Sequence, residues 1–144
     1  MKILSIEIDA NSAVMVFVEG NKKSFQVAKS GKFLSIPKNS ESITDILEFQ
    51  TNFSMFLQGE EVDLVVLCEG GNDSGKKRLR MEFAILSECE KQSKAYQTYV
   101  SSACAKLIKT TYNKETGGDF YTDLNSLGLQ KYMDKALVAA WRFI

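Results

Sequence analysis

The sequence predicts an α/β domain built on a five-stranded mixed sheet with helices on both faces. The chain opens with three strand-like segments joined by short turns, and it continues with strand-like and helix-like segments in alternation. An opening meander makes antiparallel pairs, whereas strands separated by helices make parallel crossovers. With 144 residues the chain is long enough for one hydrophobic core, so we expect a single domain over residues 1–144.

The first three strands are predicted from short-range periodicity. Residues 2–9 alternate between apolar and polar side chains, and a period of two is typical of a strand. Residues 13–19 are more uniformly apolar and predict a second strand. A Gly-Asn pair then gives a two-residue hairpin signal, so residues 23–28 are expected to return as the third strand. Its extension through residues 33–36 stays open.

Two further strands and four helices follow from apolar spacing and capping residues. Ser42 is a plausible N-cap for a helix that ends at Gly59. The two strands are expected over residues 63–68 and 95–100. The next helices are expected over residues 76–92 and from residue 101 or 102 to about residue 112. The stretch 113–126 is polar and contains two adjacent glycines, which predicts a loop, and a last helix is expected over about 127–144.

Composition excludes several classes of function. Formal net charge is zero and the chain has no histidine, so zinc sites built on Cys/His spacing and catalysis by Cys/His or Ser/His/Asp are not expected. The three cysteines are expected to be small core residues, and their odd number favours a reducing compartment. No stretch approaches the length of a membrane span, so we expect a cytoplasmic protein without membrane partners. Metal or acid–base chemistry would have to rest on carboxylates.

A glycine-rich loop suggests one alternative function. The spacing from Gly70 through Gly75 to Lys76 fits a phosphate-binding P-loop in all but its last position. Lys77 stands where such a loop carries the Ser or Thr that binds magnesium, and no later strand ends in the acid that a second magnesium contact needs. A nucleotide-binding protein that uses residues 70–76 therefore stays an alternative.

Three acids occupy positions that invite a functional explanation. Glu7 lies among isoleucines in the first strand, with Asp9 on the same face, although a polar residue on a half-exposed strand would look the same. Glu69 ends a strand that is expected to be buried, and sites form beyond the carboxyl ends of such strands. Asp134 falls within the apolar arc of the last helix, where a carboxylate is unfavourable unless it is paired, for example with Lys135, or bound to a cation.

The order of these elements, with acids at these places, resembles the RNase H-like superfamily. It looks most like the branch that contains the RuvC-type Holliday junction resolvases, and it is also similar to a family of short bacterial proteins assigned to that fold. The matching segments are ILSIE at residues 3–7, VVLCE at 65–69 and YMDKALVAAW at 132–141.

The resemblance implies a divalent-metal-dependent nuclease or a junction-binding protein that acts on DNA or RNA. In such nucleases, acids hold two Mg²⁺ or Mn²⁺ ions about 4 Å apart, which activate water and stabilise the leaving oxygen. Carried over to this chain, it implies Glu7, Glu69 and Asp134 as catalytic residues and metal ligands, with Asp9 as a further ligand. It also implies phosphate contacts from a basic run and, by analogy, a homodimer. The basic run comprises Lys76, Lys77, Arg78 and Arg80.

The chain departs from the resolvase pattern in three respects. The acid of the first strand is Glu7, where active resolvases usually carry Asp. The residues one turn before Asp134 are Gln130 and Lys131, where those enzymes have a second acid, and Lys135 follows directly. These departures keep a non-catalytic interaction module of the same fold as an alternative.

Overall fold

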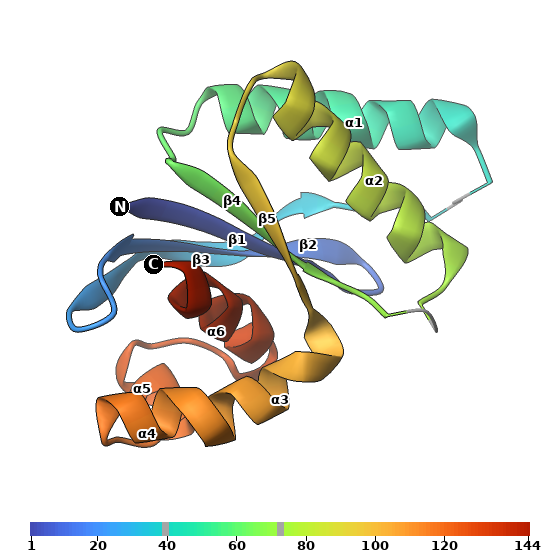
Figure 1. Ribbon diagram of the computed structural model, residues 1–144. Helices are drawn as coiled ribbons and strands as arrows, with labels where there is room; N and C mark the ends of the chain where they lie inside the picture. Colours follow the sequence, from blue (N-terminus) through green and yellow to red (C-terminus); the bar gives the residue numbers. More distant parts are fainter. Residues whose placement is uncertain (39–40, 72–73) are drawn as a thin grey trace.

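The computed structural model describes residues 1–38, 41–71 and 74–144 of the chain. Its centre is a five-stranded sheet in the order β3-β2-β1-β4-β5, with helices on both faces (Figure 1). The three opening strands pair antiparallel, and β4 and β5 extend the sheet in parallel with β1. The predicted fold class is confirmed.

The strands lie close to their predicted positions. The third strand is longer than the predicted residues 23–28, because it continues without a break through residue 35. The observed strands are β1 Lys2–Ile8, β2 Ser12–Gly20, β3 Phe25–Ser35, β4 Leu64–Glu69 and β5 Tyr96–Val100. The apolar run of β4 is buried on both faces, as a strand inside a parallel sheet requires.

Two helices, α1 (Ile43–Gln58) and α2 (Lys76–Lys91), cover one face of the sheet. The side chain of Ser42 accepts a hydrogen bond from the backbone N–H of Asp45, which confirms the predicted N-cap. The two helices contact each other through Gln50, whose amide donates to the Glu88 carboxylate at 3.0 Å. The start of α2 lies near the end of the sheet where β1 and β4 finish (Figure 1), and Lys77 there contacts the Ala10 carbonyl just after β1.

The other face is covered by α6 and by a series of short helices. After β5 the chain forms a 3₁₀ turn η1 (Ser101–Ala103), α3 (Cys104–Leu107), a π-helical turn η2 (Ile108–Tyr112), α4 (Asn113–Thr116) and α5 (Phe120–Ser126). A second 3₁₀ turn, η3 (Lys131–Met133), leads into α6 (Asp134–Phe143). Helix α6 packs on β1, β2 and β4, and it carries the buried Trp141 into the core of this face.

The loop predicted over residues 113–126 is wrong, because α4 and α5 occupy most of it. Asp119 caps α5 by accepting from the Thr122 N–H at 3.0 Å, and Phe120 and Leu124 anchor the helix in the core. The last helix also begins later than residue 127, since Gly128 takes a left-handed turn with φ 74° before η3. The polar composition of residues 113–126 predicts a loop, but a few buried residues hold α4 and α5 in place.

Period-two alternation divides the strand residues between two cores. Ile3 of β1 and Val66 and Cys68 of β4 join the core under α6, whereas Leu4 and Leu67 join the core under α1 and α2. The polar residues of β1 follow the same rule, so Glu7 starts from the face that α6 covers. In the described part of the chain, no helix combines the length and apolarity needed to cross a membrane.

The attachment of the unexpected helices can be tested at one hydrogen bond. The Tyr112 hydroxyl donates to the Asp123 carboxylate at 2.7 Å and so ties η2 to α5. Replacing Tyr112 with Phe keeps the ring, which packs edge-on against Phe120 and Trp141, and removes only this bond. We expect the free energy of unfolding in urea to fall by about 1 kcal/mol. An unchanged value would show that the bond contributes nothing to holding α5.

Candidate functional site

Glu7 is a carboxylate buried in the body of the sheet. It is only 9% exposed, and burial is the largest influence on it, raising the pKa of its carboxyl above the usual range. The positive charges of Lys135 and Arg78 oppose that rise, whereas the negative charges of Asp134 and Asp9 add to it. Glu7 is therefore the shared electrostatic neighbour of groups from α2, α6 and the β1–β2 turn.

The guanidinium of Arg78 is the nearest cation to this carboxylate. One of its nitrogens lies 3.8 Å from Oε2 of Glu7 and donates to the Cys68 carbonyl at 3.0 Å. Its Nε donates to Oε2 of Glu82 at 2.9 Å. The same Glu82 oxygen accepts the backbone N–H of Gly70 at 2.9 Å. Arg78 thus joins β1, the end of β4 and the first two turns of α2 in one network.

Glu82 is a site residue that the sequence analysis missed. It is buried, with 5% of its surface exposed, although it lies in a charged stretch that predicts a solvated helix face. The available signal was its spacing of four from Arg78, which allows an ion pair along a helix. That spacing alone could not show that the pair points into the protein.

Glu69 ends β4 as predicted, but on a different side of the sheet from Glu7. Alternation assigns Glu69 to the side of Val65 and Leu67, which belong to the core under α1 and α2. Glu7 starts from the side of α6. Being the last residue of a strand, Glu69 is only partly buried.

Asp134 is the first residue of α6 and does not lie deep in its apolar stripe. It is partly exposed, and its Oδ2 accepts a hydrogen bond from the Tyr121 hydroxyl at 3.2 Å. A negative side chain in the first turn also favours the helix dipole. The structure therefore gives Asp134 a local structural role, while its charge still reaches Glu7.

Asp9 organises the turn between β1 and β2. Its Oδ1 accepts the backbone N–H groups of Asn11 and Ser12, both at 2.8 Å, and its Oδ2 lies 3.1 Å from the ammonium of Lys32. Burial acts to raise the pKa of Asp9, but these two N–H groups and Lys32 outweigh it and lower the pKa. These contacts explain Asp9 without a metal.

The four predicted metal ligands do not form a preformed metal centre. Across residues 1–38, 41–71 and 74–144, no group of three or more His, Cys, Asp or Glu side chains is placed to hold a metal ion. Hard divalent ions require several converging oxygens, whereas Glu7 faces a guanidinium. The arrangement does not fit an Mg²⁺ or Mn²⁺ site, and the catalytic and ligand roles of Glu7, Asp9, Glu69 and Asp134 stay predictions.

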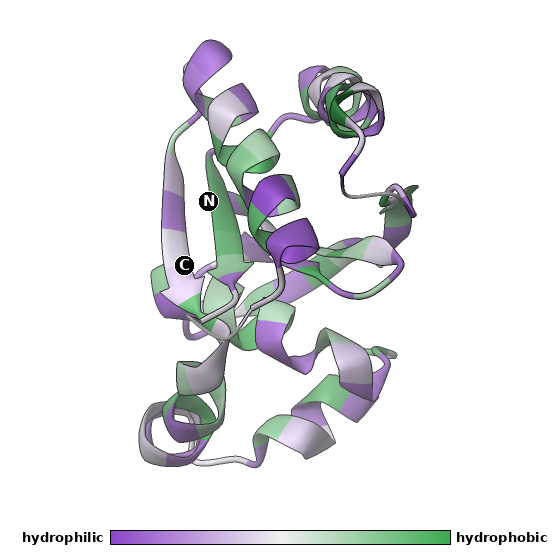
Figure 2. Cartoon of the chain, turned by 90° about the vertical axis from the view of Figure 1, so that its right-hand side faces the viewer, coloured by the Kyte–Doolittle hydropathy of each residue, from purple (hydrophilic) through white to green (hydrophobic). Residues whose placement is uncertain are grey.

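The basic run at the start of α2 divides between inward and outward directions. Figure 2 shows the beginning of this helix as strongly hydrophilic. Lys77 reaches the β1–β2 turn, where its Nζ donates to the Ala10 carbonyl at 3.1 Å, and Arg80 lies 3.4 Å from Glu41. Lys76 is exposed, whereas Arg78 points to Glu7. Their contacts with phosphates stay predictions.

The glycine loop is only partly visible as a candidate nucleotide site, because residues 72 and 73 lie outside the described residues. At its start, the Gly70 N–H already donates to the Glu82 carboxylate, whose charge would repel a phosphate. A Cβ at Gly70 would come within 1.8 Å of the Ser74 hydroxyl oxygen. Close packing, rather than a phosphate, accounts for this glycine.

The cysteines lie in the core, as predicted. Cys68 follows the β4 residue that pairs with Ile6, so it sits beside Glu7, with its Sγ 4.0 Å from Oε2. Its Sγ is also 3.7 Å from Sγ of Cys104, and that contact, together with burial, raises the pKa of the Cys68 thiol. The Cys68 thiol therefore stays protonated and adds no charge beside Glu7. The positive charges that act on Glu7 are those of Lys135 and Arg78.

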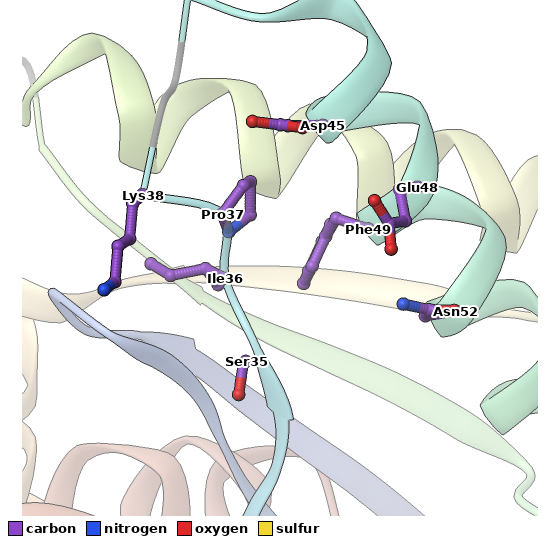
Figure 3. Close-up of a pocket in the computed structure, with 8 residues that line it drawn as sticks. All are labelled: Ser35, Ile36, Pro37, Lys38, Asp45, Glu48, Phe49 and Asn52. Atoms are coloured by element: carbon purple, nitrogen blue, oxygen red, sulfur yellow. The ribbon is translucent and has the colours of Figure 1, made fainter.

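A separate pocket of about 310 Å³ lies between the end of β3 and α1. Figure 3 shows the carboxylates of Asp45 and Glu48 projecting from α1 at its rim, with Lys38 turned away from them. None of the predicted catalytic residues lines it. Two acids at its rim disfavour a phosphate ligand, so this pocket does not extend the site around Glu7.

The burial of Glu7 predicts a specific pH dependence of stability. Because the folded state raises its pKa, Glu7 contributes fully to stability below about pH 4.5, and the contribution is lost as pH rises through the folded pKa. A Glu7→Gln variant has no such loss. We expect its free energy of unfolding, relative to the wild type, to increase between pH 4 and pH 8, measured by urea titration.

Asp9 provides a control of opposite sign. Its lowered pKa contributes stability that is present above the unfolded pKa and is lost as pH falls through the folded value. Asp9→Asn should therefore lose stability relative to the wild type at neutral pH and approach it in acid. If the free energies of unfolding of the two variants, relative to the wild type, changed with pH in the same direction, burial would not be the main influence on Glu7.

The fold has clear relatives among solved structures. A structure of Thermus thermophilus RuvC matches with a TM-score of 0.66 at 13% identity, over 98% of this chain and 91% of that one. T. thermophilus RuvC in complex with a Holliday junction substrate matches with a TM-score of 0.70 at 14% identity, over 98% and 90% of the two chains. The structural similarity shows the RNase H-like fold, and at these low identities it shows nothing beyond the fold.

Sequence comparison gives a family. A search of curated proteins finds no match to this sequence. The sequence model of one family, described as "Protein of unknown function (DUF3010)", matches residues 1–143. The chain belongs to the DUF3010 family.

Proposed function

We propose that this chain is a nucleic-acid-binding protein of the RNase H-like fold that does not cut its ligand by two-metal hydrolysis. The observation that carries the proposal is the Arg78 guanidinium, which lies 3.8 Å from the Glu7 carboxylate and 2.9 Å from that of Glu82. In this arrangement a side chain of the protein balances the buried acid.

A guanidinium cannot replace a catalytic metal ion. It carries a single positive charge, stays protonated, and has only donors, so it cannot bind and deprotonate the attacking water. Two-metal hydrolysis also needs carboxylate ligands that place one metal ion at the attacking oxygen and one at the leaving oxygen of the phosphate. Lys135, whose charge also acts on Glu7, adds further positive potential that would oppose a bound cation.

Two observations support nucleic acid as the ligand. The same fold, in T. thermophilus RuvC, has been solved with a Holliday junction substrate. In this chain, the start of α2 presents Lys76 and Lys77 at the end of the sheet. Lys77 donates to the neutral Ala10 carbonyl, so that bond leaves its charge available to a phosphate.

The proposal predicts salt-sensitive binding without cleavage. Fluorescence anisotropy with a labelled four-way DNA junction, a duplex and a single strand should show affinities that fall steeply with salt concentration. Lys77→Ala should weaken binding and reduce the slope of log affinity against log salt by about 1. The labelled strands should stay intact with Mg²⁺ or Mn²⁺ on denaturing gels.

Two outcomes would contradict the proposal in different ways. Absence of binding to all three nucleic acids would overturn nucleic acid as the ligand. Metal-dependent cleavage that disappears in Glu7→Gln would restore the nuclease interpretation of Glu7.

A second prediction concerns Arg78 itself. Arg78→Met keeps much of the side-chain volume but removes the ion-pair partner of Glu82 and one of the two cations that act on Glu7, so stability at pH 7 should fall by about 1–3 kcal/mol. Millimolar Mn²⁺ should then raise the melting temperature of this variant by ligand binding to the folded state, and leave that of the wild type unchanged.

Arg142→Met is the matched control, because Arg142 is an exposed arginine at the end of α6. It should show neither the loss of stability nor the Mn²⁺ effect. A Mn²⁺-induced rise in the wild type that Glu7→Gln abolishes would show that Arg78 does not exclude a metal.

A further inference from the structure

Two exposed tyrosines flank Asp134 beside the site. Tyr121 on α5 is 42% exposed, and its hydroxyl donates to Asp134 at 3.2 Å. Tyr132 on η3, two residues before Asp134, is 45% exposed. Rings of this size usually pack in a core or an interface, so two exposed rings on adjacent elements are suited to contact a ligand. We call Tyr121 and Tyr132 the tyrosine pair.

Positive side chains continue from the tyrosine pair to the start of α2. The ammonium of Lys32 on β3 lies 4.5 Å from the centre of the Tyr132 ring and 3.1 Å from Asp9. At the next residue of the same turn, Lys77 donates to the carbonyl of Ala10 at 3.1 Å. One turn, Asp9–Ala10, therefore connects an aromatic ring and two lysines from three separate elements.

This combination differs from a site for a lone phosphate. Lysines provide charge that follows a sugar–phosphate backbone, and aromatic rings provide flat apolar surfaces on which bases stack. Stacking of one base on a ring strengthens binding severalfold or more and tolerates any base, because every base has a π-face. Each component alone is common on protein surfaces, but here Lys32 connects Tyr132 to the turn that Lys77 also contacts, and Tyr121 contacts Asp134, whose charge acts on Glu7.

We propose that the tyrosine pair stacks on unpaired bases, so that the ligand of this chain is a nucleic acid with a single-stranded segment. The inference rests on the proposed nucleic-acid binding and specifies its ligand. In a closed duplex the faces of the bases are covered by their neighbours, and only unpaired bases can lie on a protein ring. Lys32 and Lys77 then contact the phosphates on either side of the Asp9–Ala10 turn.

The test uses the full chain and two fluorescein-labelled probes, a single strand of about 16 thymidines and a blunt duplex of the same length. The wild type should bind the single strand more tightly than the duplex. Tyr132→Ala should weaken single-strand binding by at least about fivefold and leave duplex binding within about twofold. Tyr132→Phe, which keeps the ring, should retain the affinity for the single strand.

Phe83→Ala is the matched control, since Phe83 is 75% exposed and lies on the face of α2 away from the sheet. It removes a ring that is more exposed than Tyr132 and should not change the binding of either probe. Thermal unfolding of each variant verifies that Tyr132→Ala is folded. Tyr121→Ala provides a second, independent loss of affinity for the single strand.

The outcomes separate the inference from the function on which it rests. If the wild type binds neither these probes nor a junction, the proposed function fails, and the inference fails with it. If the wild type binds nucleic acid but both tyrosine variants bind the single strand as the wild type does, only the stacking proposal is overturned. Equal affinity of the wild type for duplex and single strand would also overturn it.

Discussion

A carboxylate buried in an apolar sheet is the constraint on which the site depends. Glu7 sits between Ile6 and Ile8 and is only 9% exposed. An isolated charge there would be strongly unfavourable, so the fold must either keep it protonated or bring a cation to it. The protein brings Lys135 and Arg78, whose charges oppose the effect of burial, although burial still raises the pKa of Glu7. Arg78 also donates to Glu82 and to the Cys68 carbonyl.

That network also fixes how the elements meet. Glu82 accepts the Gly70 N–H, so one carboxylate holds both the guanidinium and the chain as it leaves β4. Gly70 has no side chain because the Ser74 hydroxyl and Nε of Arg78 occupy the space a Cβ would need. Of the residues that suggest a phosphate loop, Gly70 is therefore part of this internal network, whereas Lys76 is exposed and Lys77 bonds the Ala10 carbonyl. Gly70 satisfies the sequence pattern, but its packing against Ser74 and Arg78 explains it.

Much of the fold could be predicted because its elements have strong local signals. The alternation of β1, the apolar run of β4 and the Ser42 cap each depend on neighbouring residues only. Helices α4 and α5 could not, because a polar stretch with two adjacent glycines is typical of a loop. What makes them helical is distant: Tyr112, Phe120 and Leu124 pack against α6, and Asp123 binds the Tyr112 hydroxyl. Tertiary contacts decided where local preference was weak.

The candidate site was likewise predictable only where a local signal exists. Glu7 stood out as an acid among isoleucines, but its partner lies 71 positions later, and no local pattern links them. The helical spacing of α2 does indicate which of its basic residues point inward. Arg78 shares a helix face with the buried Met81, Glu82 and Ile85, whereas Lys76 and Phe83 lie on the exposed side. An arginine in phase with a buried stripe needs a buried acid; Glu82 on the same stripe is that acid at 2.9 Å, and Glu7, 3.8 Å away near the end of β1, is a second. The basic run therefore divides into the inward Arg78, which pairs with buried carboxylates, and outward side chains, of which Arg80 pairs with Glu41 and Lys77 bonds the Ala10 carbonyl.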